Sequence, residues 1–393
     1  MSRFKMVRQV VRRSMPVIVG LASLGGASAV RAAAYTLLDL GTLGGSNSYS
    51  NAVNAFGQVV GTSSPVGDAT QYGYRTAPNS AINPGSRLGA PGGVNTAQTA
   101  DGINDAGQAV GTANFTANAS ITHAYRTAAN GPLNAASDLG TLGGPSSGAN
   151  GINASGQVIG ASDTNDASIT RAFRTTANGV ITAASDLGSL GGSEVGALGI
   201  NASGQVVGYS FTTGDAQAHA YRTLANGKIT AASDLGTLGG IGSLAYGINN
   251  AGQAVGFANL TTANTNHHAF RTAPNGPINA ASDLGTLGGT NSQAFAINNL
   301  GQVVGTSDLA GDAISHPFFV DVTGGMQDLT NLIPAGSGFV PTTVNGINDS
   351  GQIVGFGTVG GQTHAFLLAP TPEPASLSLL ALGTLGLLAR RRR

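Results

Sequence analysis

The side chains that could take part in catalysis or metal binding recur at regular intervals along this chain of 393 residues. Six aspartates each begin an Asp-Leu-(Gly or Thr) string: Asp39, Asp138, Asp186, Asp234, Asp283 and Asp328. Five histidines each begin a His-(Ala or Pro)-aromatic string: His123, His219, His268, His316 and His364. A catalytic carboxylate pair or a metal site needs two or more such groups converging within about 10 Å. Side chains that recur once per repeat are instead spread over the molecule, so both sets are predicted to be structural.

Each of the two sets has its own structural interpretation. The aspartates mostly stand directly before glycine-rich turns, where a side-chain carboxylate can cap the turn. The histidines occupy one position of an expected strand, where we predict a hydrogen bond between neighbouring repeats. His267 and His268 are adjacent, so they would point to opposite faces of that strand and cannot chelate one ion. The chain has no cysteine, which excludes disulfides and thiolate sites. We therefore predict no catalytic, cofactor-binding or metal-binding residue.

The loops between the second and third expected strands differ from repeat to repeat, and such loops commonly carry binding functions. They contain six aspartates: Asp68, Asp163, Asp166, Asp215, Asp308 and Asp312. No single loop offers more than two carboxylates, whereas Ca²⁺ takes about six to eight oxygen ligands. Solvated turns are the main interpretation, with calcium binding as the alternative. Glu194 is the one glutamate between residues 35 and 370, and would be the first residue to inspect for an enzyme.

The composition of the chain favours strands and turns and argues against a nucleic-acid partner. Charged residues make up 9% of the chain, and lysine and glutamate occur twice each, whereas glycine occurs 61 times. Residues 35–370 contain eight basic and 17 acidic side chains. An acidic surface without a stripe of Lys and Arg repels phosphate backbones. Tryptophan is absent and most aromatic residues belong to repeated strings, which weakens a sugar-binding interpretation because such sites use exposed rings.

The repeats define the expected strands. The most regular string is Asn-x-x-Gly-Gln, whose asparagines are Asn54, Asn104, Asn153, Asn201, Asn249, Asn298 and Asn348. In each copy, β-forming runs flank a short loop that ends in glycine, which predicts a β-hairpin with a positive φ at that glycine. The aromatic string that follows predicts a third strand, and segments such as 228–236 predict a fourth.

Seven units of about 48 residues, each with four short strands, are typical of a β-propeller. The predicted fold class is therefore all-β, a seven-bladed β-propeller-like array of four-stranded repeats. A linear β-solenoid is the alternative. The chain begins with a fourth-strand string at residues 35–40, and the last unit lacks one. We therefore expect residues 35–40 to pair with the last unit and close the ring, which removes the exposed strand edges.

The N-terminal residues 1–34 have the parts of a secretory signal peptide. Residues 1–13 contain five basic side chains and no acidic one, and an apolar run and a small-residue cluster follow. We predict cleavage after Ala34 by signal peptidase. An uncleaved membrane anchor is the alternative.

The C-terminal residues 371–393 contain a second targeting pattern. Pro372, Glu373 and Pro374 precede an uncharged run at 375–389, and the chain ends in Arg390, Arg391, Arg392 and Arg393. As a helix this run would span about 22 Å, less than the roughly 30 Å hydrocarbon core, with the arginines on the cytoplasmic side. A plain tail anchor is the alternative interpretation. The three-part pattern resembles the PEP-CTERM sorting signal of exported proteins in Gram-negative bacteria that make exopolysaccharide. The resemblance implies an exosortase-like processing enzyme as a partner and transient insertion in the inner membrane.

The aromatic string also resembles the HAF-repeat family of extracellular bacterial proteins, over residues 35–368. The His-Ala-Phe string is intact at His268–Phe270 and His364–Phe366, and the chain departs from it at Tyr72, Arg171 and Pro317. This resemblance implies an extracellular location rather than a particular activity.

Together these patterns predict a signal peptide at 1–34, a seven-repeat propeller domain at 35–370 and a sorting signal with a short membrane helix at 371–393. We expect an exported, non-enzymatic protein of the cell surface or extracellular matrix. It would be a binding or structural module associated with exopolysaccharide, matrix proteins or a biofilm. The alternative is a polysaccharide-acting enzyme with its site in the propeller channel or on the loop face.

Overall fold

The computed structural model describes residues 35–371, apart from 69, 92–97, 116–120, 167–168, 263–265, 323 and 335. This part of the chain is all-β, with strands joined by short turns and single 3₁₀ turns. No helix among these residues has the length and apolarity required to cross a membrane. Several predictions concern segments outside the described residues, so the structure does not test them. These segments are the signal peptide with Ala34, the Pro372–Pro374 motif, the C-terminal helix and the arginine cluster.

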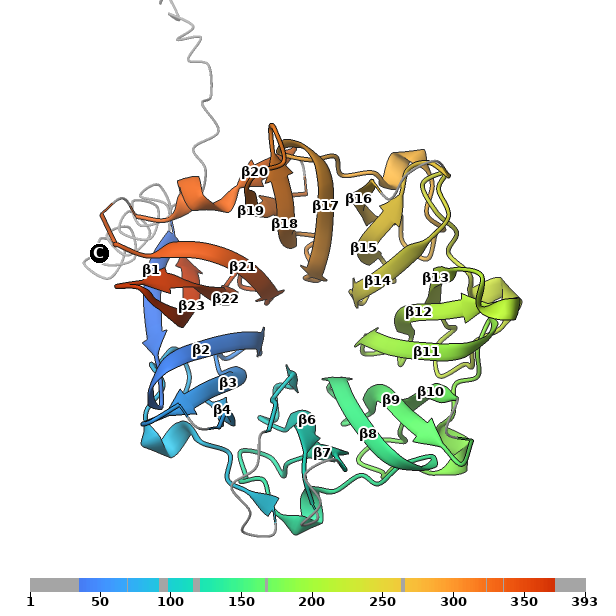
Figure 1. Cartoon of the computed structure of the whole chain (residues 1–393), viewed down its shortest axis with the longest axis horizontal. Coiled ribbons are helices and arrows are strands. Elements are labelled where there is room, and N and C mark those ends of the chain that lie inside the picture. The colour runs from blue at the N-terminus through green and yellow to red at the C-terminus, as the bar shows by residue number, and fades with distance from the viewer. Residues whose placement is uncertain are drawn as a thin grey trace, which may run out of the picture. The chain divides into compact units, whose positions relative to one another are not determined.

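The strands form successive antiparallel units. In chain order the units are β2 (Gly44–Val53), β3 (Val59–Pro65) and β4 (Tyr72–Arg75); β5 (Gly102–Ile103), β6 (Ala109–Ala113) and β7 (His123–Arg126); β8 (Gly143–Ile152), β9 (Val158–Thr164) and β10 (Thr170–Arg174); β11 (Gly191–Ile200), β12 (Val206–Thr212) and β13 (Ala218–Arg222); β14 (Ser243–Ile248), β15 (Ala254–Asn259) and β16 (His267–Arg271); β17 (Gly288–Ile297), β18 (Val303–Leu309) and β19 (Ser315–Val320); and β21 (Val340–Ile347), β22 (Ile353–Val359) and β23 (Gln362–Pro370). Figure 1 shows these units around a central axis, with the first strand of each unit innermost. Residues 35–371 therefore form a propeller-like ring.

The predicted fourth strand is present in two places within the described residues. β20 (Met326–Asp328) pairs with β19, and β1 (Tyr35–Gly41) pairs with β23. Elsewhere the prediction of a four-stranded repeat was wrong, because the segment forms a 3₁₀ turn and then a single β-bridge, such as Tyr221 to Asp234. The reason is local. The Oγ of Ser233 accepts a hydrogen bond from the N–H of Thr230, and this capping of an Ala-Ala-Ser turn competes with extended pairing.

The two ends of the described chain meet in one antiparallel pair. Tyr35 lies opposite Pro370, and Leu38 lies opposite Leu367. Further along the same edge of β23, Asn47 of β2 pairs with Thr363 through a parallel bridge, while β22 occupies the opposite edge. The prediction that residues 35–40 pair with the last unit is confirmed. Without this strand the last unit would present a free edge.

The hydrophobic core lies between neighbouring units. The central aromatic residues of the repeated string are all fully buried: Tyr74, Tyr125, Phe173, Tyr221, Phe270, Phe318 and Phe366. Each packs with residues of an adjacent unit, as Phe270 of β16 does in one cluster with Val207 of β12. The middle strands are therefore covered on both faces, which explains why apolar and polar residues do not alternate along them.

The hairpin turns have the predicted backbone. The glycine of each Asn-x-x-Gly turn has a positive φ, for example 75° at Gly204. In this conformation a side chain is strained, which is why glycine is required there. The prediction of left-handed glycines in these hairpins is confirmed.

Candidate functional site

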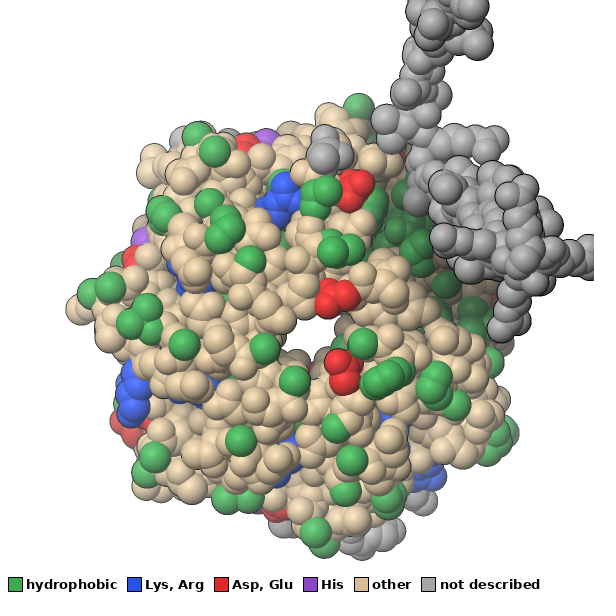
Figure 2. Space-filling model, turned by 180° about the vertical axis from the view of Figure 1, so that it is seen from behind, with side chains coloured by type: hydrophobic (Ala, Val, Ile, Leu, Met, Phe, Trp, Pro, Cys, Tyr) green, Lys and Arg blue, Asp and Glu red, His purple; other side chains and the backbone are tan. Residues whose placement is uncertain are grey.

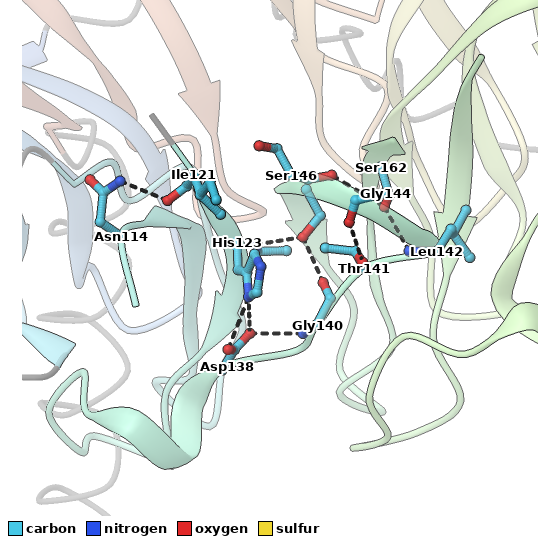
Figure 3. A network of polar contacts seen from close by, with 12 residues as sticks. Asn114, Ile121, His123, Asp138, Gly140, Thr141, Leu142, Gly144, Ser146 and Ser162 are labelled. Atoms are coloured by element: carbon cyan, nitrogen blue, oxygen red, sulfur yellow. Dashed lines mark hydrogen bonds and ion pairs between the residues drawn. The ribbon is translucent and has the colours of Figure 1, made fainter. Parts of the chain in front are cut away.

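Each of the five repeated histidines pairs with a repeated aspartate of the same sheet, and the fifth pair, His364 with Asp39, joins the two ends of the described chain. His123 Nδ1 lies 2.9 Å from Asp138 Oδ1, and the same oxygen accepts a hydrogen bond from the N–H of Gly140 at 2.8 Å (Figure 3). The predicted capping of the glycine-rich turn is therefore confirmed. The prediction of a histidine bond between repeats was wrong. Tyr125 and Asp138 are bridged, which places the imidazole and the carboxylate on adjacent segments of the same sheet.

The aspartates of the Gly-Asp-Ala loops also accept hydrogen bonds from backbone N–H groups. Asp68, Asp215 and Asp312 have φ values of 53°, 54° and 57°. Each accepts the N–H of a residue in the preceding glycine-rich segment, and these hydrogen bonds hold the pKa of Asp68 and Asp215 below the usual value. Within residues 35–371, as far as they are described, no three His, Asp or Glu side chains are placed to hold a metal ion. The calcium alternative therefore has no ligand set assigned to it.

Glu194 lies away from the centre of the ring. Its side chain is exposed on β11, and its Oε1 accepts a hydrogen bond from the Tyr209 hydroxyl at 2.7 Å. It lines neither of the two cavities of the central channel described below. The residue that the sequence singled out for an enzyme is thus a surface side chain.

The repeated asparagines form a closed circle of hydrogen bonds around one end of the channel. In each unit the Asn Nδ2 donates to the backbone oxygen of the equivalent asparagine in the next unit, at 2.9–3.1 Å. The last of these bonds, from Asn348 to Asn54, joins the final unit to the first. Each asparagine also donates to the glutamine of its own turn, as Asn201 does to Gln205 at 2.8 Å. These side chains are therefore occupied by structural bonds.

Two adjoining cavities of about 300 and 290 Å³ occupy the channel. The first is lined by six of the seven asparagines of the circle, all except Asn104, together with Asp105 and Asp349. Figure 2 shows the opening at the centre of the ring, with acidic side chains at its edge. An apolar girdle of six residues is shared by both cavities: Val53, Ile103, Ile200, Ile248, Ile297 and Ile347. Beyond this girdle lies the second cavity.

The second cavity is where the repeat symmetry fails. In every unit, the residue three positions before the repeated asparagine lines this cavity. These residues are Asn51, Asp101, Asn150, Leu198, Tyr246, Phe295 and Asn345. At the three asparagines the Nδ2 donates to a backbone oxygen of the next unit at 2.9–3.0 Å. Such a bond contributes about 1 kcal/mol. Asp101, Leu198 and Phe295 carry no donor for it, so these units lack a bond that their neighbours make.

Asp101 is a carboxylate on the channel wall without a counter-charge. Its Oδ1 accepts from Asn51 Nδ2 at 3.1 Å, and its Oδ2 accepts from Thr99 Oγ1 at 2.5 Å. No ion pair to it occurs in the described part of the chain. Removal of the carboxylate from water raises its pKa to about 6, against the opposing effect of the two hydrogen bonds.

The other side of the same cavity is aromatic. The rings of Tyr246 and Phe295 lie edge to face, with centroids 5.2 Å apart. Tyr246 also contacts Phe257, whose ring lies 4.8 Å from that of His267. Burial raises the pKa of Tyr246. The cavity therefore has a polar wall from β21, β2, β8 and Asp101, which directly precedes β5, and an apolar wall from β11, β14 and β17.

Sequence reasoning missed these residues. Tyr246 and Phe295 stand outside the repeated aromatic string, and Asp101 stands outside the Asp-Leu string. The available signal was a departure from asparagine at one position of the repeat. It was not recognised because nothing in the sequence says that this position faces the channel.

The comparisons with known proteins concern mainly the C-terminus. A family model of the PEP-CTERM protein-sorting motif matches residues 370–393. This motif supports an exported protein that is an exosortase-type substrate. No curated protein matches the chain.

Two solved structures were compared with this fold. One, described as a "putative gluconolactonase", is 11% identical with a TM-score of 0.39, over 86% of this chain and 92% of its own. A hypothetical protein from Leishmania major is 13% identical with a TM-score of 0.26, over 59% of this chain and 83% of its own. Similarity at this level carries no argument about activity.

Proposed function

We propose that residues 35–370 are a seven-bladed β-propeller that acts as a non-enzymatic binding module of the cell surface or extracellular matrix. The observation that carries this proposal is the second channel cavity. It combines three asparagines that the repeat retains with a carboxylate and two aromatic rings that replace asparagine in other units. The repeated polar side chains are otherwise occupied by turn caps and bonds between units. The symmetry-breaking residues are therefore the ones available for recognition.

A binding role is favoured over catalysis because few acidic or basic side chains are found among the described residues that line this cavity. Asp101 is the one carboxylate among the described residues that line it, and no histidine, lysine or arginine lines it. Glycoside hydrolysis ordinarily uses two carboxylates about 5–10 Å apart. The alternative of a polysaccharide-acting enzyme would require Asp101 to act with a partner beyond this cavity.

The proposed location follows from the two targeting patterns. The sorting motif at 370–393 supports export and processing by an exosortase-like enzyme. We extend this to signal peptidase cleavage after Ala34, transient insertion of the 375–389 helix in the inner membrane, and display by a Gram-negative bacterium. An association with exopolysaccharide and membership of the HAF-repeat family belong to the same proposal.

The test follows the full-length chain in a Gram-negative host that has an exosortase. We expect mass spectrometry of the exported protein to give an N-terminus at Tyr35, and replacement of Pro372, Glu373 and Pro374 by alanine to leave the protein in the inner membrane. The purified protein should not cleave common polysaccharides. An intact Met1 in exported material would contradict the export scheme. Glycan cleavage that is abolished by Asp101→Asn in a folded protein would favour the enzyme.

A further inference from the structure

The wall of the second cavity combines two kinds of surface that the repeat itself does not require. Three units retain an asparagine there, and that asparagine bonds to the next unit. Three neighbouring units replace it by Leu198, Tyr246 and Phe295, and another unit replaces it by Asp101. The apolar replacements are consecutive in the ring, and the polar residues occupy the remaining units. The two surfaces therefore face each other across the channel.

We propose that this cavity binds one neutral sugar ring of a glycan. The apolar C–H face of the ring lies on Tyr246 and Phe295, and its hydroxyls bond to Asp101 and the amides of the opposite wall. This inference rests on the proposed binding function and names its ligand class.

The polar wall has hydrogen-bonding capacity left for hydroxyl groups. A carboxylate offers about four acceptor positions, and Asp101 uses two of them for Asn51 and Thr99. The Oδ1 atoms of Asn150 and Asn345 accept no hydrogen bond from the residues that the structure describes. Acceptors gathered on one wall suit a ligand that presents several O–H donors. A saturated ring bearing hydroxyls meets this need while its C–H groups contact the aromatic rings.

The charge and the volume of the cavity narrow the class of ligand further. No Lys or Arg side chain is present among the described residues that line the cavity, and Asp101 would repel an anion. Phosphate groups and uronic acids are therefore disfavoured relative to neutral sugars. A volume of about 290 Å³ is at the lower end of small-molecule sites, which are about 300–1,000 Å³. It suits one ring, such as the end or a branch of a chain, rather than a long oligosaccharide.

The chain itself supplies fold-compatible variants for the test. Asparagine already occupies the equivalent position in three units, so Asp101→Asn and Tyr246→Asn each introduce the residue that the repeat uses there. Asp186→Asn is the matched control. It changes a carboxylate in the same way at a turn cap outside the channel, where its Oδ1 accepts from Gly188.

Binding is measured on the purified full chain by saturation-transfer NMR and calorimetry. The probes are the methyl glycosides of glucose, galactose, mannose and N-acetylglucosamine, with glucuronic acid as the anionic comparison. We expect millimolar binding of at least one neutral glycoside and little binding of glucuronic acid. Asp101→Asn and Tyr246→Asn should each raise the Kd for this neutral glycoside by roughly tenfold or more, while Asp186→Asn leaves the Kd unchanged. Thermal melting of each variant confirms that it is folded.

The outcomes separate this inference from the function on which it rests. Absence of binding by every neutral glycoside, or binding that both channel variants retain, overturns the sugar site and leaves the export scheme intact. Preferential binding of glucuronic acid overturns the charge argument and with it the proposal. Binding followed by turnover keeps the site and overturns the non-enzymatic function.

Discussion

At the scale of single residues, Asp101 is the carboxylate whose burial should have a measurable effect on the free energy of unfolding. Its folded-state pKa of about 6 exceeds the usual 3.8, so the folded protein holds the proton more tightly than the unfolded chain does. The contribution of Asp101 to the stability of the fold is therefore highest below about pH 4, falls between about pH 4 and 6, and is constant above. The hydroxyl of Tyr125, which lies nearby, stays neutral over this range because its pKa is raised well above the usual value.

The first prediction follows from this sign. Asp101→Asn should stabilise the protein at pH 7 by about 1–3 kcal/mol and remove its share of the pH dependence between 4 and 6. Urea denaturation at pH 4, 5, 6 and 7 measures both effects. Equal stabilities of variant and wild type at all four pH values would show that this carboxylate is not desolvated.

The second prediction concerns the hairpin glycines. Gly204 has a φ of 75°, and a Cβ there would overlap Asn226 Oδ1. Gly204→Val should therefore cost about 1–3 kcal/mol. Gly325 has open space around its Cα and no positive φ, so Gly325→Val is the control and should be near neutral. Denaturation midpoints compare the two, and an equal loss at both sites would argue against turn strain.

At the scale of elements, β1 occupies the place on β23 that β20 occupies on β19 and that a single β-bridge occupies in other units. It buries Leu40 completely, and His364 of β23 pairs with Asp39 at 2.9 Å, as His123 does with Asp138 within one unit. A non-local strand thus substitutes for a local segment and joins the two ends of the described chain.

The third prediction tests this closing strand. Removal of Tyr35–Leu40 from the mature chain should lower the melting temperature and promote aggregation, because it exposes apolar surface and the free edge of β23. Thr36→Ala changes an exposed residue of the same strand and should alter stability by less than about 0.5 kcal/mol. Light scattering and thermal melting provide the readouts. An unchanged melting temperature after the deletion would mean that the ring does not depend on β1.

At the scale of the whole molecule, the circle of asparagines has no first or last member. Asn348 bonds to Asn54 at 2.9 Å across the closure, and Asn201 bonds to Asn249 at 3.1 Å inside the chain. In a closed ring the closing link and an internal link should contribute alike. In an open array the terminal link would contribute less.

The fourth prediction compares these two links. Asn348→Asp and Asn201→Asp each remove an amide donor and place a carboxylate against a carbonyl oxygen, so each should cost about 1–3 kcal/mol. The two losses should agree within about 0.5 kcal/mol, as measured by urea denaturation. A markedly smaller loss at Asn348 would indicate that the ring opens between the last and first units in solution.

The sequence by itself determined the repeat, its hairpins, the turn-capping aspartates and the closure of the ring. These features are local or periodic: a glycine with positive φ, or a string repeated in register, has the same physical meaning in every copy. The hydrogen-bond partner of each repeated side chain was harder to predict from the sequence. The histidines bond to an aspartate of their own sheet, which for His364 is Asp39 at the other end of the described chain, and Ala-Ala-Ser forms a capped turn instead of a full strand. These outcomes depend on competition between nearby hydrogen bonds.

Only the tertiary structure decided which residues meet in the channel. Asp101 and Tyr246 lie 145 positions apart and belong to no shared motif, and each looks like an isolated departure from the repeat. The ring brings the same position of every unit to one axis, so single exceptions in separate units become opposite walls of one cavity. A periodic pattern can predict that such a ring forms. The contents of its centre depend on where the period is broken and on which face of the strand turns inward, and that face was set by packing between units.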